Sequence, residues 1–317
     1  MRSFMMKSFR TKDLVSMESL TTADIIQIFE TTARQKKERA KKGTNKPVLQ
    51  GKTLGMIFEK ASLRTRISFE VGMLHLGGRA IYLDQTNFKL GERESVYDVA
   101  KNMERFMDIL MLRTFSHQAI LDMARHASIP VINGLSDDEH PCQALADLYT
   151  IMEHRGELKG RKLVFVGDGN NVATSLAYAA ALMGMHFVCA SPEGYTLKQE
   201  IVDKARSMAV FGATVEATTD VREAVKNADC LYTDVWASMG QEKEKEIRAA
   251  AFREYQINES LMALARPDCL IEHCLPAHRG EEITDGVIDG PNSVVFDEAE
   301  NRMHVQKAVM TLLLGRG

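Results

Sequence analysis

The feature that most constrains the fold is a regular alternation of short β-rich runs with helix-length segments. The runs are TLGMIF, AIYLD, DILML and PVINGL, followed by KLVFVGD, HFVCAS, ATVEA, CLYTDVW and CLIEHCLP. Strands separated by helices form parallel sheets that are covered on both faces. The glycines and charges of HRGELKGRK, at 154 to 162, mark a domain boundary. The chain is therefore predicted to be α/β, with two doubly wound parallel-sheet domains at residues 1–153 and 154–296.

The last segment, residues 297–317, predicts one more helix. Gly315 is a natural stop for this helix. The apolar residues that recur at helical spacing are Met303, Val305, Val309, Leu312 and Leu313. We expect an amphipathic helix that packs back on the first domain.

Charge and hydropathy exclude several classes of protein. Forty basic and 43 acidic side chains leave a net charge of −3, which predicts no nucleic-acid partner and no anionic membrane surface. The longest apolar run, at 177 to 190, is shorter than the ~20 residues of a membrane span. The basic first residues lack the apolar core of a secretory signal, so the cytoplasm is predicted, with a short organellar transit remnant as the alternative.

The cysteines predict neither disulfides nor a metal site. Five are scattered without CxxC spacing, which favours reduced thiols. His273, Cys274 and His278 do not have the spacing of a structural zinc site, and no metal is predicted. Cys274 has three readings from the residues alone: a nucleophile, a polar contact or, the one favoured, core filler.

The stretch SLRTRISFEVGMLHL follows a predicted strand and reads as a helix. Ser62 is a natural N-cap, Gly77-Gly78 a stop, and one apolar face carries Ile67, Val71 and Leu74. Basic residues are unfavourable at a helix N-terminus unless an anion offsets them. Arg64, with the hydroxyls of Ser62 and Thr65 and the free backbone N–H groups, therefore predicts a phosphate site.

Other polar residues also follow predicted strands. Arg113 follows the run DILML, at the carboxyl end of a predicted strand, where α/β proteins bind ligands. Pro141 places His140 and Gln143 at the start of a helix. These two side chains are suited to orienting a carbonyl group.

The stretch LVFVGDGNNVATSL is not a dinucleotide-binding loop. The third glycine of GxGxxG would fall at Val172. Asn170 and Asn171 instead suit a small polar or anionic group. Two further sets of residues follow strands, Asp234 with Ser238 in TDVWASMGQE and Cys274 in EHCLPAHRGEE.

Taken together, SLRTR, HPCQ, DVWASMGQE, HCLP and ENRMHVQKAVM resemble the ornithine carbamoyltransferases over nearly the whole chain. The resemblance implies transfer of the carbamoyl group of carbamoyl phosphate to the side-chain amine of L-ornithine, giving L-citrulline and phosphate in arginine metabolism. It implies no cofactor and no metal, a homotrimer with active sites at subunit interfaces, a carbamoyl phosphate-binding domain at 1–153 with the helix 297–317, and an ornithine-binding domain at 154–296.

The resemblance also implies roles for individual residues. Phosphate would be held by Ser62, Leu63, Arg64, Thr65 and Arg113. The carbamoyl group would be oriented by Arg113, His140 and Gln143, and ornithine would be held by Asn171, Asp234, Ser238 and Met239. Cys274 and Leu275 would lie near the reacting groups, and Arg302 would face the active site.

Two positions depart from the family pattern. The phosphate motif ordinarily reads STRTR, and here Leu63 replaces its first threonine. Lys89 stands where many relatives carry a glutamine in a loop that reaches the neighbouring subunit. We hypothesise that Lys89 offsets the lost hydroxyl; the alternative is that Lys89 points into solvent and Leu63 merely packs.

Other readings remain open. Aspartate- and putrescine-specific relatives differ at the SMG loop, whereas acetyl- or succinyl-ornithine relatives carry similar phosphate motifs. From other classes, an oxidoreductase is disfavoured by Val172, and a non-catalytic binding protein is disfavoured by the retention of Arg64, Arg113, His140, Asp234 and Cys274. The residues do not distinguish an anabolic from a catabolic enzyme.

Overall fold

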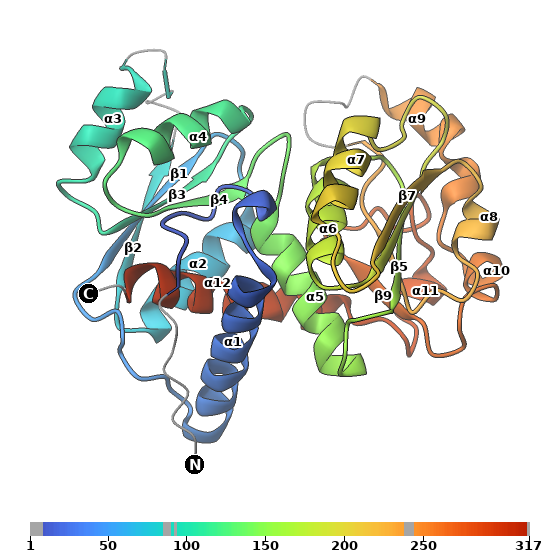
Figure 1. Ribbon diagram of the computed structural model, residues 1–317, viewed down its shortest axis with the longest axis horizontal. Helices are drawn as coiled ribbons and strands as arrows, with labels where there is room; N and C mark the ends of the chain where they lie inside the picture. Colours follow the sequence, from blue (N-terminus) through green and yellow to red (C-terminus); the bar gives the residue numbers. More distant parts are fainter. Residues whose placement is uncertain (1–8, 85–89, 92–93, 238–243, 316–317) are drawn as a thin grey trace. The chain divides into compact units, whose positions relative to one another are not determined.

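The computed structural model describes residues 9–84, 90–91, 94–237 and 244–315 (Figure 1). The chain forms two compact units. The first runs to Cys142 and takes in the chain again from Arg302, and the second runs from Gln143 to Asn301.

The first unit contains a parallel four-stranded sheet. Its strands are β1 (Thr53–Phe58), β2 (Arg79–Asp84), β3 (Ile109–Arg113) and β4 (Val131–Leu135), in the order β2-β1-β3-β4. The chain order reverses between β1 and β3, and ligands of such sheets bind at the carboxyl ends of the strands at this switch point. The other elements are η1 (Met17–Ser19), α1 (Thr22–Lys42), α2 (Leu63–His75), α3 (Val96–Met103) and α4 (His117–His126).

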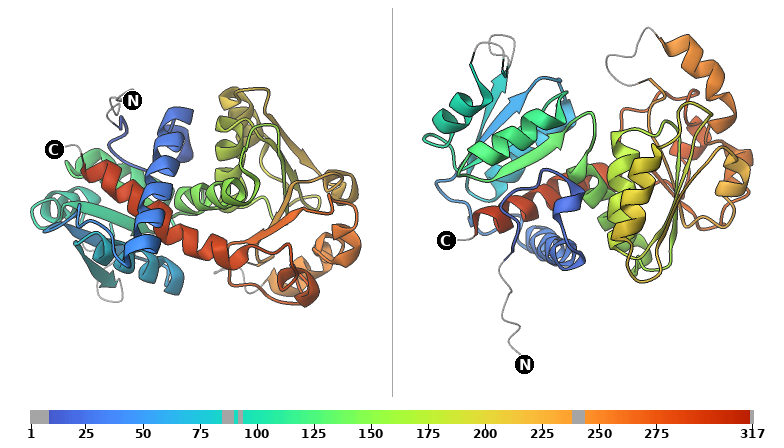
Figure 2. Two further views of the ribbon diagram at one scale, coloured as in Figure 1. Left: turned by 90° about the horizontal axis from the view of Figure 1, so that it is seen from below. Right: turned by 45° about the horizontal axis from the view of Figure 1, so that its top comes forward.

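The second unit contains a parallel five-stranded sheet with helices on both faces (Figures 1 and 2). The order β7-β6-β5-β8-β9 places its switch point between β5 (Lys162–Val166) and β8 (Cys230–Thr233). The other strands are β6 (His186–Ala190), β7 (Thr214–Thr218) and β9 (Leu270–His273). The helices are α5 (Pro141–Arg155), α6 (Asn171–Leu182), α7 (Gln199–Met208), α8 (Val221–Ala224), α9 (Lys245–Ala251), η3 (Arg253–Tyr255), α10 (Glu259–Met262) and α11 (Asp285–Ile288).

Each predicted β-rich run overlaps a strand, and both sheets are parallel, so the predicted fold class is confirmed. The central strands read as continuous apolar runs because both faces are covered: β1 is buried from Leu54 to Phe58, and β5 from Leu163 to Val166. The longest apolar run of the sequence belongs to α6 and β6, whose side chains are mostly buried in the second unit. Among the described residues, no helix combines the length and the apolar character needed to cross a membrane.

The last helix, α12 (Val295–Leu314), packs on the first domain as predicted. From Arg302 onward it belongs to the first unit, where α1 lies across it (Figure 2). Gln35 Nε2 donates to Thr311 Oγ1 at 2.9 Å, and Lys307 Nζ donates to Asn45 Oδ1 at 2.5 Å.

The prediction that α12 is amphipathic is wrong, because the helix has a buried polar side as well as a buried apolar side. The buried polar residues are Asn301, Arg302, His304, Gln306 and Lys307. Asn301, Arg302 and Lys307 are compatible with burial because they donate hydrogen bonds to Glu153, Thr65 and Asn45, respectively. The helix also begins at Val295, two residues earlier than predicted.

Helix α2 has the predicted start and end but not a buried Ile67 face. Ile67 and Leu74 are 48% and 71% exposed in the isolated chain. The side that packs inside the unit carries Thr65, Ser68, Phe69, Gly72 and Met73. Gly77 follows the helix at a φ of 82°, and a Cβ there would approach Pro47 Cβ to 2.6 Å, so only glycine fits this stop.

Candidate active site

The predicted phosphate turn lies directly after β1, at the switch point of the first sheet. Ser62 caps α2: its Oγ accepts from the Thr65 backbone N–H at 3.4 Å and donates to Thr65 Oγ1 at 3.0 Å. Arg302 Nη2 also donates to Thr65 Oγ1, at 2.8 Å. Because two donors already occupy the lone pairs of Thr65 Oγ1, its own proton is left to be donated to a ligand.

The three basic residues around this turn have different environments. Lys60 Nζ pairs with Asp137 Oδ1 at 2.5 Å and lies 4.2 Å from the centre of the Phe115 ring. Arg66 pairs with Glu70 at 2.9 Å. Arg64 is half-buried in the first turn of α2, where the helix dipole makes a positive charge unfavourable without an anion. Arg64 is therefore the residue of this cluster placed to bind phosphate.

Arg113, His140 and Arg302 form a buried basic group in the first unit. They are 7%, 4% and 4% exposed, and Arg113 is the last residue of β3, across the switch point from the phosphate turn. Burial, followed by the charges of Arg302 and Arg113, holds the pKa of His140 well below its usual range. His140 is thus a neutral imidazole at physiological pH, able to donate a hydrogen bond without becoming charged.

Helix α5 begins at Pro141, as predicted, which puts His140 and Gln143 at its start. Gln143 is fully buried, and its amide nitrogen donates to Asp147 and Glu298.

In the second unit, Asp234 follows β8 and Asn170 follows β5, so both lie at the switch point of the second sheet. Asn170 Oδ1 caps α6 by accepting from the N–H groups of Val172 and Ala173. Asn170 Nδ2 donates to Asp234 Oδ2 at 2.9 Å. Asn171, the first residue of α6, is half-buried.

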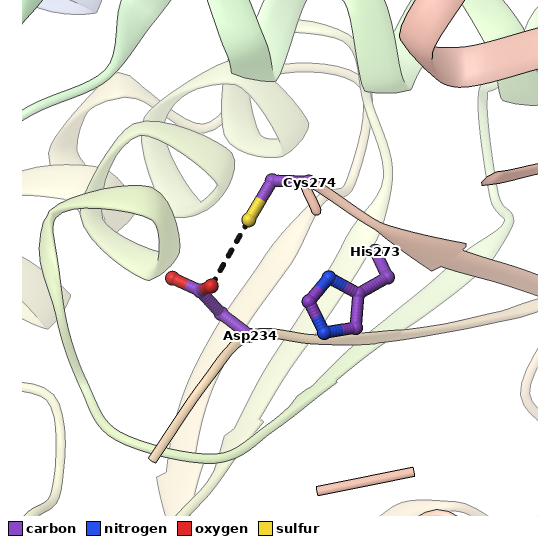
Figure 3. A group of neighbouring side chains, drawn as sticks. All are labelled: Asp234, His273 and Cys274. Carbon is purple, nitrogen blue, oxygen red and sulfur yellow. Dashed lines mark hydrogen bonds between the residues drawn. The ribbon is translucent and has the colours of Figure 1, made fainter. Parts of the chain in front are cut away.

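Cys274 is in polar contact with Asp234 (Figure 3). Its Sγ donates to Asp234 Oδ1 at 3.0 Å, so the core-filler reading is wrong. Burial and the Asp234 carboxylate raise the pKa of the Cys274 thiol well above its usual range. Since the thiolate is the nucleophilic form, this environment also argues against covalent catalysis by Cys274.

Asp234 keeps acceptor capacity for a ligand. Its Oδ1 accepts from Cys274 and from the Val235 backbone N–H, and its Oδ2 from Asn170. A carboxylate has about four lone-pair sites, so roughly one remains for an ammonium group.

His273 supports the turn that carries Cys274 and Leu275. Its Nδ1 accepts from the Leu275 backbone N–H at 2.9 Å, which leaves the proton on Nε2 to be donated to Glu282 at 3.1 Å. Leu275 has a φ of 55°, a left-handed conformation that this contact helps to hold. Asp234, His273 and Cys274 have ligand-type atoms within 4.8 Å of one another, but both His273 nitrogens are already engaged.

The predicted residues thus fall into one group per unit. The first unit contains Ser62, Arg64, Thr65, Arg113, His140 and Arg302. The second contains Gln143, Asn171, Asp234, Cys274 and Leu275, of which Asp234 and Cys274 are in direct contact. Leu63 is 71% exposed, so its side chain does not pack within the chain. Lys89, Ser238 and Met239 lie outside the described residues.

Sequence reasoning missed the acids that support these groups. Glu282 and Glu298 hold the His273 turn through its imidazole and its backbone N–H. Both lie close to recognised motifs in the sequence, but nothing in their spacing indicates which polar atoms they contact.

Comparisons with known proteins match both units. Residues 12–153 match the carbamoyl-P binding domain of aspartate/ornithine carbamoyltransferases, and residues 159–313 match their Asp/Orn binding domain. An ornithine carbamoyltransferase of Pyrococcus abyssi is 51% identical over 312 residues, covering 98% of each chain. An anabolic ornithine carbamoyltransferase of Pyrococcus furiosus is 50% identical over 312 residues, covering 98% of this chain and 99% of its own.

Solved structures agree. The structure of ornithine carbamoyltransferase from Pyrococcus furiosus superposes with a TM-score of 0.94 at 49% identity, covering 98% of this chain and 99% of its own. That from Thermus thermophilus gives 0.86 at 44% identity, covering 96% and 99%. The two domain matches and these relatives together show that the chain belongs to the aspartate/ornithine carbamoyltransferase family.

Proposed function

We propose that the protein transfers the carbamoyl group of carbamoyl phosphate to the side-chain amine of L-ornithine, giving L-citrulline and phosphate in arginine metabolism. The observation that carries this proposal is that each sheet places a matching set of groups at its switch point. The first unit offers basic and hydroxyl groups for a phosphorylated donor, and the second offers a carboxylate for an amine.

Carbamoyl phosphate is assigned to the first group. Arg64, the Thr65 hydroxyl and the free N–H groups of α2 would bind its phosphate. Arg113 and neutral His140 would donate to the carbonyl oxygen, which becomes negatively charged in the tetrahedral intermediate. Arg302 fixes Thr65 and adds positive charge nearby.

Ornithine is assigned to the second group, with Asp234 accepting from its α-ammonium group. Its neutral side-chain amine attacks the carbonyl carbon, the C–O bond to phosphate breaks, and the amine proton leaves with phosphate. Proximity and electrostatic stabilisation supply most of the rate, without a strong general base. Activity should rise with pH, because an alkylamine has a pKa of ~10.4 and only its neutral form attacks.

Citrulline formation from carbamoyl phosphate and ornithine tests the reaction, with acetylornithine, putrescine and aspartate as competing acceptors. Asp234→Ala should abolish productive ornithine binding and leave carbamoyl phosphate binding nearly intact. Asp203→Ala, at an exposed site on α7, is the matched control and should behave like the parent. Binding of both substrates without citrulline would instead support a non-catalytic protein, and loss of both ligands in Asp234→Ala would indicate a folding defect.

A homotrimer is the proposed assembly. Its support in the chain is an apolar surface on α2 and on the edge strand β2, formed by Leu63, Ile67, Leu74 and Ile81, which are 44–71% exposed. A surface of this kind marks a subunit interface. Sedimentation should give three times the chain mass of 35.4 kDa.

We also propose a cytoplasmic location and the domain boundaries 1–153 and 154–296, with 297–317 joining the first domain.

A further inference from the structure

Three acids are buried in the second unit, one of them on α5. Asp147 on α5, Glu272 on β9 and Glu298 on α12 are each at most 1% exposed. Burial, then the charges of Glu298 and Asp147, raise the pKa of Glu272 well above its usual range.

The carboxylates of Asp147 and Glu298 determine the orientation of the Gln143 side chain. Gln143 Nε2 donates to Asp147 Oδ1 at 2.6 Å and to Glu298 Oε1 at 2.9 Å. A carboxylate only accepts, and the amide has two N–H groups, so the nitrogen must face the acids. Gln143 Oε1 is buried and accepts no hydrogen bond from the described residues. The side chain therefore has one unsatisfied function, that of an acceptor.

Glu298 also contacts the turn of residues 273–276, which carries Cys274 beside Asp234. Its Oε2 accepts from the His273 backbone N–H at 2.8 Å, directly before Cys274. One carboxylate thus fixes both Gln143 and the turn of residues 273–276.

We propose that Asp147 and Glu298 are positioning residues that turn Gln143 into an obligate acceptor and so select the amino group of the carbamoyl donor against a methyl group of the same size. This inference rests on the proposed function and on the role that the family resemblance implies for Gln143, which is to orient the carbamoyl group together with Arg113 and His140. An amino group satisfies Gln143 Oε1, whereas a methyl group leaves it buried without a donor, which is costly. If the amide could rotate, it would present N–H groups and lose this preference.

Two stable ligands that differ only at this group test the selection. Phosphonoacetamide carries the amino group, and acetonylphosphonate carries a methyl group in its place. Calorimetry on the full-length enzyme should show tighter binding of phosphonoacetamide. Glu298→Gln lets the Gln143 amide rotate, because the new amide can donate to its oxygen. This variant should narrow the ratio of the two dissociation constants by about tenfold, with inorganic phosphate binding unchanged.

Glu153→Gln is the matched control, since Glu153 lies on α5 with Gln143 and Asp147 and accepts a hydrogen bond from Asn301 instead of Gln143. It should keep the parental ratio. A cycle with Gln143→Met separates positioning from general packing: in that background Glu298→Gln should not narrow the ratio further. Strictly additive effects, or an equal loss of both ligands in Glu298→Gln, would overturn the proposal.

Asp147→Asn is the alternative variant if Glu298→Gln does not fold. It removes the carboxylate that accepts the other N–H of the Gln143 amide. A parental ratio of the two dissociation constants in Asp147→Asn would also overturn the proposal. The proposed function fails separately, if the parent enzyme forms no citrulline. A parent that forms citrulline but binds both ligands equally contradicts only the selection.

Discussion

At the scale of single residues, the local partners of each side chain distinguish ligand-binding groups from structural ones. Arg64 and Arg66 are two residues apart on the same helix, yet Arg64 is half-buried, whereas Arg66 is exposed, pairs with Glu70 and lies 4.1 Å from the Tyr82 ring centre. Cys274 and His273 are adjacent, yet the thiol contacts Asp234 while the imidazole supports the backbone of its own turn. Residue type alone does not separate these roles.

The two arginines provide a matched test of the phosphate turn. Arg64→Lys should lower turnover by about 100-fold or more, because an ammonium cannot reproduce the two-pronged contact of a guanidinium with phosphate. Arg66→Lys, which keeps a charge beside Glu70, should stay near the parental rate. Steady-state citrulline formation measures both. Similar rates for the two variants would remove Arg64 from the phosphate site.

At the scale of elements, α12 joins the first unit through a buried polar layer. His75, the last residue of α2, lies in the same environment as Lys307 and His304 of α12 and Arg39 of α1. Burial, followed by the charges of Arg39, Lys307 and His304, lowers the pKa of His75 to about 4. The packing of α2 against its neighbours therefore depends on a neutral imidazole.

This arrangement predicts acid sensitivity. An unfolded histidine binds its proton near pH 6.5, and the folded His75 near pH 4, so the unfolded state holds more protons between these values. The free energy of unfolding should thus fall as the pH drops from 6.5 to 4, by an amount that solvent screening of this half-buried group keeps small.

His75→Gln should remove that part of the pH dependence. Urea unfolding at pH 8 measures the packing cost of the substitution, since the imidazole is neutral in both states there. Repeating the measurement at pH 5 isolates the charge effect. A variant that loses as much stability on acidification as the parent would contradict the assignment.

At the scale of the whole molecule, the proposed trimer gives meaning to the departures from the family pattern. Leu63 lacks the usual hydroxyl and is exposed in the single chain. Lys89 would then place a positive charge near the carbamoyl phosphate of an adjacent subunit, where a charged hydrogen bond contributes ~1.5–3 kcal/mol.

The Michaelis constant for carbamoyl phosphate tests this compensation in Lys89→Ala, Leu63→Thr and the double variant. Lys89→Ala should raise the constant about tenfold, and Leu63→Thr should recover much of the loss. Coupling of the two changes supports compensation. Additive or negligible effects would reject it and leave Lys89 as a solvent-exposed residue.

The alternation of strands and helices was readable from the sequence, because buried parallel strands must be apolar on both faces and helices must cover them. The start of α2 at Ser62 and of α5 at Pro141 was readable too, since capping and proline geometry are local. By the same reasoning, an arginine in the first turn of a helix indicated an anion.

The tertiary structure alone decided which faces and partners these residues have. Periodicity identified the Ile67 face of α2 but not its exposure, and it did not anticipate the buried polar side of α12. Gln143 and Glu298 are 155 residues apart in sequence, and their contact depends on α5 and α12 packing together. Local propensity determines where an element begins and ends, whereas burial and hydrogen-bond partners follow from contacts between segments distant in sequence, which no local pattern encodes.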